Sequence, residues 1–151
     1  MNSKAKRRIE PILEMYKIEK QNFEDFLKAC PYPLEDLQQD KRQEQLVYWR
    51  HIGALFATLK AGSVTDGAKL LNKNHATLLH SFKNLECGYP EFYENMELIN
   101  KECEVRLQNE SVDKDILASK INQLALDVEK LQNKANQLGL EIDVNFTLKS
   151  L

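Results

Sequence analysis

The chain has 151 residues, of which 42% are hydrophobic and 29% are charged. This length and balance fit one modest core with an appendage, and they argue against a disordered or fibrous protein. No apolar run approaches the roughly 20 residues that span a bilayer, and the opening residues MNSKAKRRIEPIL lack the apolar segment of a secretory signal. We therefore expect a cytoplasmic protein that does not contact a membrane.

Charge is distributed unevenly around the net value of −2. Residues 1–90 hold 14 basic and 11 acidic side chains, whereas residues 91–151 hold 7 and 12. The basic excess is largest within residues 41–90, with 7 basic against 3 acidic side chains. A bound polyanion is therefore expected there. The three cysteines, Cys30, Cys87 and Cys103, form no C-x-x-C pair and predict neither a disulfide framework nor a standard zinc site. No cofactor is expected.

Apolar residues recur at helical spacing from Ile9 onward, which predicts an all-α body. Pro11 suits the first turn of a helix, so residues 1–8 are expected to form a basic arm ahead of it. A solvated tail is the ordinary interpretation of such an arm. Pro31 and Pro33 are expected to end the second helix.

A break at Ala61-Gly62 is followed by Ser63 and Asp66, which resemble a capping box for a short helix ending near Leu71. The stretch Asn72-Lys73-Asn74 is polar and predicts a three-residue turn. The next helix is expected to point Leu78, Leu79, Phe82 and Leu85 inward. The opposite side then carries Ala76, His80 and Asn84, with Thr77 beside them.

Two short helices joined by a tight turn form the arrangement that places a second helix in a DNA major groove. Similar shapes also occur in helical domains without a DNA role, in which Asn74 would simply cap the helix. A metal site is not expected, because five residues separate His75 from His80 and place the two rings about 140° apart around the helix.

The stretch RHIGALFATLKAGSVTDGAKLLNKNHATLLHSFKNLE, residues 50–86, resembles the C-terminal DNA-binding domain of the chromosomal replication initiator DnaA. The hallmark of that family is Gly-Gly-Arg-Asp-His-Thr-Thr, a hydrophobic pair and a second histidine, and residues 74–80, NHATLLH, match its second half. The resemblance implies that Arg42 enters the minor groove, that Asn74, His75 and Ala76 meet base edges, and that Thr77 reaches a phosphate. Lys73 is expected to hold the backbone, and His80 and Lys83 complete the expected DNA surface.

The chain departs from the family at several positions of the motif. The two glycines are Leu71 and Asn72, the arginine is Lys73, the aspartate is Asn74 and the first threonine is Ala76. Asparagine pairs best with adenine and alanine contacts only a thymine methyl, so the family's sequence preference does not carry over. The sequence has no G-x-x-x-x-G-K-[ST] loop, and the initiator's ATPase is therefore missing.

After Ser111 the apolar positions alternate in steps of four and three, which is the a and d pattern of a coiled coil. The expected oligomerisation residues are Leu117, Ile121, Leu124, Val128, Leu131 and Leu138. They favour a homodimer, most simply a parallel one, with Gly139 ending the helix. The alternative is a long helix folded back onto the domain. Residues 140–151 alternate apolar and polar and predict a strand that pairs with another subunit or a partner protein.

Together these patterns predict an all-α, non-enzymatic, sequence-specific binder of double-stranded DNA that regulates transcription or replication as an oligomer. Its expected parts are a basic arm (1–8), a DnaA-like helix-turn-helix domain (9–110), a coiled-coil helix (112–139) and a tail (140–151). The alternative is an adaptor whose helix-turn-helix has lost DNA binding and which acts through the coiled coil and tail. An acidic side chain interrupting the surface of Arg42, Lys73 and Lys83 would favour that alternative.

Overall fold

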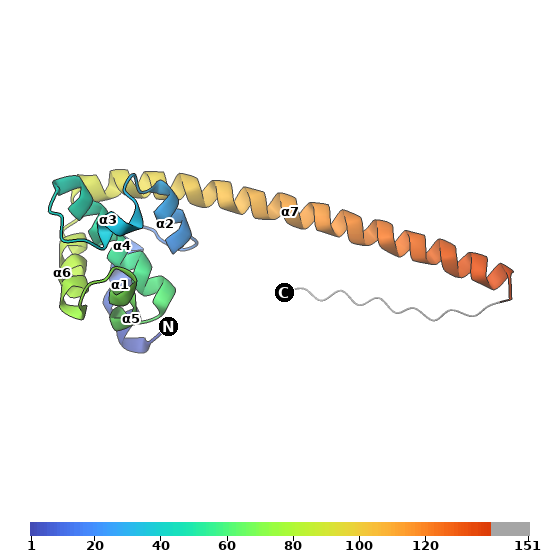
Figure 1. Ribbon diagram of the computed structural model, residues 1–151, viewed down its shortest axis with the longest axis horizontal. Helices are drawn as coiled ribbons and strands as arrows, with labels where there is room; N and C mark the ends of the chain where they lie inside the picture. Colours follow the sequence, from blue (N-terminus) through green and yellow to red (C-terminus); the bar gives the residue numbers. More distant parts are fainter. Residues whose placement is uncertain (140–151) are drawn as a thin grey trace. The chain divides into compact units, whose positions relative to one another are not determined.

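The computed structural model describes residues 1–139, which are mostly helical and contain no strand. The all-α prediction is confirmed for this part of the chain, and the strand predicted for the tail lies outside it. The helices, shown in Figure 1, are α1 (Ser3–Met15), α2 (Phe23–Ala29), α3 (Leu34–Leu37), α4 (Glu44–Ala61), α5 (Val64–Leu70), α6 (His75–Glu86) and α7 (Pro90–Gln137). Met1–Arg106 form one compact unit, and a second begins at Leu107.

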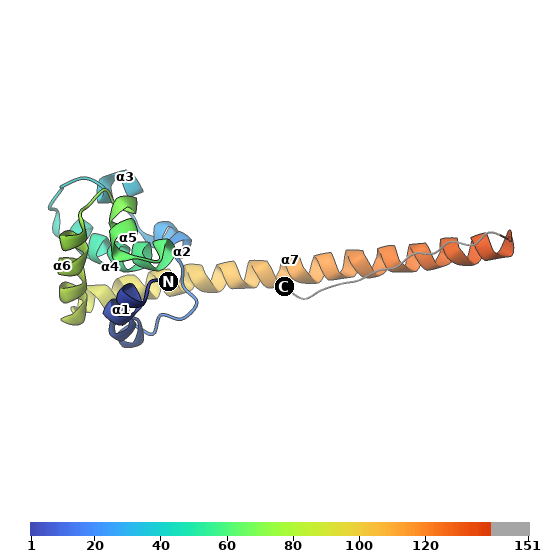
Figure 2. The same ribbon diagram turned by 90° about the horizontal axis from the view of Figure 1, so that it is seen from below.

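Helix α4 is the centre of the first unit. Every residue from His51 to Thr58 is buried, because α2, α3, α5 and α6 all pack against this helix. Figure 1 and Figure 2 both show α5 and α6 next to it. The Phe26 ring of α2 stacks on Phe56, with the ring centroids 5.8 Å apart. A helix buried on most sides is expected to lack a polar stripe, as α4 does over this stretch.

Helix α1 begins at Ser3, so the predicted start near Pro11 and the separate basic arm over residues 1–8 are wrong. The Asn2 side chain accepts a hydrogen bond from the Lys4 amide and caps the helix. The buried stripe begins at Ala5 and continues through Ile9, Ile12 and Tyr16. Pro11 lies on the exposed side, where water can satisfy the backbone carbonyl that the missing N–H leaves unpaired. Burial of this stripe therefore outweighs the preference of proline for the first turn.

Helices α5 and α6 are joined by a short turn, as predicted. The Ser63 side chain accepts a hydrogen bond from the Asp66 amide at the start of α5, and Asn74 caps α6. Between them Asn72 adopts a left-handed conformation with φ 53°, which asparagine tolerates better than most residues. Gly67 allows α5 to approach α4 closely, because a Cβ there would lie 2.9 Å from the backbone of Thr58. The turn and this contact fix the position of α6.

Helix α7 continues without interruption from Pro90 to Gln137. The predicted division between a domain ending at residue 110 and a coiled-coil helix starting at residue 112 is therefore not a break in the helix. No glycine or proline occurs between Pro90 and Gly139, so no residue ends the helix earlier. Gly139 has φ 77° just beyond the helix, as predicted.

The first part of α7 belongs to the core of the first unit. Its buried residues follow helical spacing and are Phe92, Met96, Ile99 and Cys103. Arg106 forms a two-pronged ion pair with the fully buried Asp25 of α2, at 2.9 and 3.1 Å, and donates to the Lys20 carbonyl at 2.8 Å. Within residues 1–139, no helix combines the length and hydropathy needed to cross a bilayer.

Candidate nucleic-acid interface

The outward-facing residues of α6 are those that the sequence predicts. Ala76, His80 and Lys83 are exposed and form what we call the outer face of α6. His75 is exposed at the first turn, and Thr77 and Asn84 are partly exposed. Asn84 donates a hydrogen bond to the backbone carbonyl of His80 at 3.0 Å, and its amide nitrogen lies 3.1 Å from the His80 ring. The outer face thus offers imidazole and ammonium groups around the small Ala76.

Asn74 has a structural task at the start of α6. Its side-chain oxygen accepts hydrogen bonds from the Thr77 amide at 2.9 Å and from the Thr77 hydroxyl at 3.0 Å. Bidentate recognition of adenine needs both the oxygen and the nitrogen of an asparagine amide. While Asn74 caps the helix, only its NH₂ group can serve a base, so full recognition of an adenine by Asn74 would require the cap to open. The geometry therefore shows Asn74 as the cap of α6.

Lys73 does not extend toward solvent as a backbone-binding lysine would. Its side chain is only 9% exposed, and its ammonium donates to Asp40 at 2.7 Å and to the carbonyls of Gln39 at 2.9 Å and Gln38 at 3.3 Å. The hydrogen bond from Lys73 and its positive charge hold the pKa of Asp40 below its ordinary value. Lys73 therefore connects the turn before α6 to the loop before α4.

Arg50 holds the same loop from the other side. Its guanidinium donates to the carbonyls of Leu37 at 3.0 Å, Gln39 at 2.8 Å and Lys41 at 2.9 Å. We call residues 38–43 the α3–α4 loop. With its backbone bound by two cations, this loop presents Arg42 to solvent beside α6. Arg42 and Asn84 line one shallow hollow of about 400 Å³, together with Glu44, Tyr48 and the buried His51.

His51 lies under the outer face and contacts α6 from α4. Its Nδ1 atom is 2.8 Å from the Ser81 hydroxyl, and its ring is 6.1 Å from that of His80. Burial, with the nearby charges of His80 and Arg50, lowers the pKa of His51 to about 4. His51 is therefore neutral near pH 7 and adds no charge to the interface. No local pattern in the sequence indicates this contact, because it joins positions 30 residues apart.

Three basic residues of α1 lie on the other side of α6. Lys4, Arg7 and Arg8 line a hollow of about 510 Å³ with His75, Leu79 and Val64, and none of these six residues is acidic. We call Lys4, Arg7 and Arg8 the α1 cations. Among residues 1–139, no carboxylate forms an ion pair with any of them. The sequence-based interpretation as a solvated arm missed this cluster, although Ala5 in the apolar stripe was a signal that the helix starts earlier.

The α1 cations and Arg42 flank the outer face of α6 on opposite sides. At 100° per residue, His75 and Leu79 lie roughly 90° to one side of the buried stripe, and Asn84 lies roughly 100° to the other. The α1 cations share a hollow with His75 and Leu79, whereas Arg42 shares one with Asn84. The exposed surface of α6 therefore runs between the three α1 cations on one side and Arg42, whose hollow also contains Glu44, on the other.

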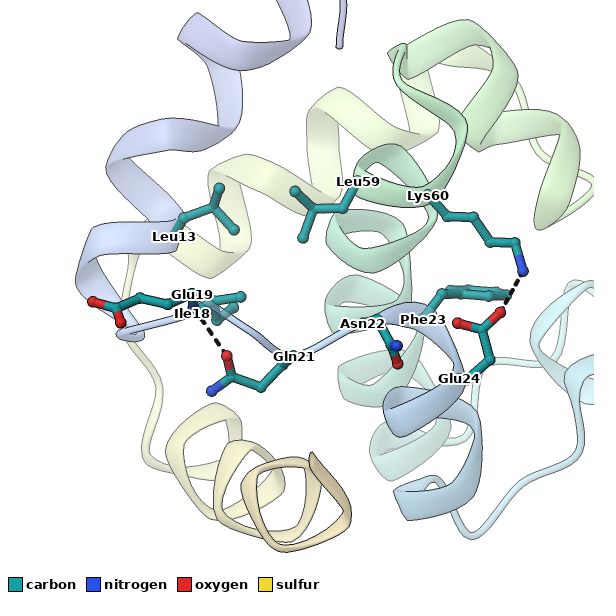
Figure 3. A pocket seen from close by; sticks show the side chains of 9 residues that line it. All are labelled: Leu13, Ile18, Glu19, Gln21, Asn22, Phe23, Glu24, Leu59 and Lys60. Carbon is teal, nitrogen blue, oxygen red and sulfur yellow. Dashed lines mark hydrogen bonds and ion pairs between the residues drawn. The ribbon is translucent and has the colours of Figure 1, made fainter. Parts of the chain in front are cut away.

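A third hollow, of about 270 Å³, lies away from this interface among α1, α2 and α4 (Figure 3). Leu13, Ile18 and Leu59 line its apolar part. At its other end the Lys60 ammonium pairs with Glu24 at 2.6 Å and lies 5.4 Å from the centre of the Phe23 ring. Because Lys60 and Glu24 already bind one another, this hollow is best explained by packing between helices.

Comparisons of the chain with protein-family models, with curated proteins and with solved structures found no match. Among residues 1–139, no three His, Cys, Asp or Glu side chains gather closely enough to hold a metal ion. The surface of α6, with the α1 cations and Arg42 beside it, is the candidate binding site in the described part of the chain.

Proposed function

We propose that this protein binds double-stranded DNA, with α5, the turn and α6 acting as a DnaA-like helix-turn-helix and α6 entering the major groove. The observation that carries the proposal is the pair of cationic elements flanking α6, namely the α1 cations and Arg42 on the α3–α4 loop. A major groove is about 12 Å wide and is bordered by two phosphate backbones. A helix about 10–12 Å in diameter fits it, and positive charge is then needed on both sides.

Within this proposal the residues divide into two groups. His75, Ala76 and His80 face the bases, and Asn74 contributes only the NH₂ group that its cap leaves free. Arg42, Lys83 and the α1 cations contact phosphates. The Thr77 hydroxyl also contacts a phosphate when it gives up its hydrogen bond to Asn74. Lys73 and Arg50 act indirectly, because their hydrogen bonds fix the loop that carries Arg42. Lys73 thus changes from an expected backbone contact to a positioning residue.

The N-terminus of α6 supports the same arrangement. The first amides of a helix and its macrodipole favour negative charge, and His75 opens this 12-residue helix next to the α1 cations. A phosphate at this position would meet positive charge from the helix end and from at least one arginine. Such a contact would also fix the angle at which α6 enters the groove.

The test is a salt titration of binding to a random-sequence duplex and to duplexes selected by the full-length protein, followed by fluorescence anisotropy. Binding should weaken steeply with salt, because each neutralised phosphate releases counterions. Replacing Arg7 and Arg8 together by alanine, or Arg42 alone, should lower affinity. It should also reduce the slope of log K against log salt by about 0.9 for each phosphate that is no longer neutralised. Lys28→Ala, an exposed lysine on α2, is the matched control and should change neither.

Base and backbone contacts should be separable in the same assay. His75→Ala or His80→Ala should change the selected sequence, whereas Arg42→Ala should weaken binding to all sequences to a similar degree. Flat affinity between low and moderate salt, or equal effects of Lys28→Ala and the double arginine variant, would contradict the proposal.

One observation favours the adaptor alternative. Asp40 is 98% exposed and is bound to Lys73, so an acidic side chain does interrupt the surface of Arg42, Lys73 and Lys83. In an adaptor, the variants at Arg7, Arg8 and Arg42 would leave every duplex affinity at background. The α1 cations weigh against this alternative, because they supply a second basic surface without a carboxylate in its lining.

A further inference from the structure

The helix of the second unit carries a line of apolar a and d residues, which we call the seam. Its leucines are exposed to solvent. Leu117, Leu124 and Leu131 are 59%, 55% and 62% exposed, and Ile121 and Val128 between them are partly exposed. Leucines at this exposure, repeated every seven residues on one side of a helix, indicate a surface that a second helix covers. The steps of four and three fit a left-handed coiled coil.

Charged residues accompany the seam along one edge, immediately before its a positions. They are spaced seven apart, alternate in sign, and are Asp113, Lys120, Asp127 and Lys134. We call them the flanking charges. Among residues 1–139 none of the four forms an ion pair. The other edge is uncharged over the same length, with Ala118, Ala125 and Gln132.

We propose that a second copy of this chain covers the seam in antiparallel orientation, with Lys120 facing Asp127 of the second copy and Asp113 facing its Lys134. In antiparallel pairs, residues along one edge of the seam meet the same edge of the other helix. Two-fold symmetry repeats each contact, so the dimer gains four ion pairs. The same register stacks Ile121 on Leu124 and Val128 on Leu117 of the second copy.

A parallel pair gains none of these contacts. Its charged edge would face the other helix's uncharged edge, so Lys120 would meet Ala125 and Asp127 would meet Gln132. Lys114 occupies the a position seven residues before Ile121. A parallel pair would place it directly opposite Lys114 of the second copy. In the antiparallel register Lys114 instead lies over Leu131, where its aliphatic stem can pack. The a and d residues alone favour pairing, and the flanking charges decide its direction.

The alternating signs also select the register. Sliding the antiparallel pair by one heptad in one direction brings Lys120 opposite Lys134 and Asp127 opposite itself. Sliding it in the other direction brings Asp113 opposite Asp127 and Lys120 opposite itself. Both shifted registers therefore place only like charges together, which disfavours them.

Charge reversal in the full-length chain tests the orientation by sedimentation equilibrium without DNA. Lys120→Glu should weaken the dimer on the order of ten-fold, because two attractive contacts per dimer become repulsive. Asp127→Lys should do the same, and the double variant should return close to the original dissociation constant. Added salt should reduce the differences among the four proteins.

Lys130→Glu is the matched control, since it makes the same charge change on α7 at an exposed position outside the seam and its two edges. It should leave the dimer unchanged, and far-UV circular dichroism should show equal helicity in all variants. A monomer at tens of micromolar would overturn the proposal, as would a dimer that the single reversals do not weaken or that the double variant does not restore. Because no DNA is present, these outcomes do not depend on the proposed function.

Discussion

At the scale of single residues, His51 couples the folded state to pH. Its pKa is about 4 in the folded protein, against an ordinary value of 6.5, because burial disfavours the charged ring. Below pH 6.5 the unfolded chain binds a proton that the folded chain does not. The free energy of unfolding should therefore fall as pH drops from about 6.5 toward 4, by roughly 3 kcal/mol at most from this group.

We predict that His51→Gln reduces this fall in the free energy of unfolding at acid pH, because an amide can form a hydrogen bond with Ser81 without binding a proton. Urea unfolding at pH 7, 6, 5 and 4 measures the free energy of unfolding of both proteins. At pH 7 the variant should be no more stable than the original protein. The difference between their free energies of unfolding should shrink or reverse as pH falls. Thr65→Ala, at an exposed position, is the control, since it removes no group that binds protons in this pH range and should not alter the slope. Parallel curves for His51→Gln and the original protein would contradict the prediction.

The residues of α6 also show what the sequence could predict at this scale. Ala76 and His80 follow from helical periodicity alone, and the structure places them on the exposed side. The partners of Lys73 could not be predicted in the same way, because they lie on a loop 33 to 35 positions earlier in the chain. Periodicity states which direction a side chain faces, whereas its hydrogen-bond partners depend on which loops the fold brings beside it.

At the scale of elements, the position of α6 depends on how closely α5 approaches α4. Gly67 lies where a Cβ would be 2.9 Å from both the Cα and the amide nitrogen of Thr58, and backbone atoms cannot easily move aside. Alanine is about 1 kcal/mol better than glycine within a helix when space allows. Here the contact with Thr58 should outweigh that preference, because overpacking a tight site costs about 1 to 3 kcal/mol.

We therefore predict that Gly67→Ala lowers the free energy of unfolding and moves α5 and α6 away from α4. Thermal unfolding measures the first effect, and faster amide hydrogen exchange in α5 and α6 measures the second. Thr65→Ala, at an exposed position of the same helix, should be close to neutral. A more stable Gly67→Ala protein would mean that the helices can separate slightly at no cost.

Element boundaries were predicted well where local capping decides them and poorly where burial does. Ser63, Asn74 and Gly139 mark ends that the structure confirms. Pro11 misled the prediction of α1, because the apolar stripe from Ala5 continues through a helix that tolerates proline on its exposed side. The Asp25 to Arg106 ion pair, which connects α2 to α7 across 81 positions, had no local signal at all.

At the scale of the whole molecule, the direction of helix pairing determines how far apart the dimer carries its two proposed DNA-binding units. In the antiparallel register the two-fold axis crosses between residues 122 and 123, so Leu107 of the two copies lies at opposite ends of the paired helices. At 1.5 Å per residue these two positions are roughly 45 Å apart along the pair. A parallel dimer would instead bring both DNA-binding units to the same end and favour two half-sites one helical turn apart.

We predict that the dimer joins two separate duplexes, because its proposed DNA-binding units are attached at opposite ends of the paired helices. An immobilised duplex, saturated with protein, should retain a fluorescent duplex of the same sequence from solution. Lys120→Glu should lose this retention at concentrations where its dimer dissociates, while its binding to a single duplex in anisotropy stays within about two-fold of the original protein. Restoring the dimer with the added change Asp127→Lys should restore retention. If the original protein binds single duplexes and forms the dimer yet never retains the second duplex, the prediction that the dimer joins two duplexes is wrong.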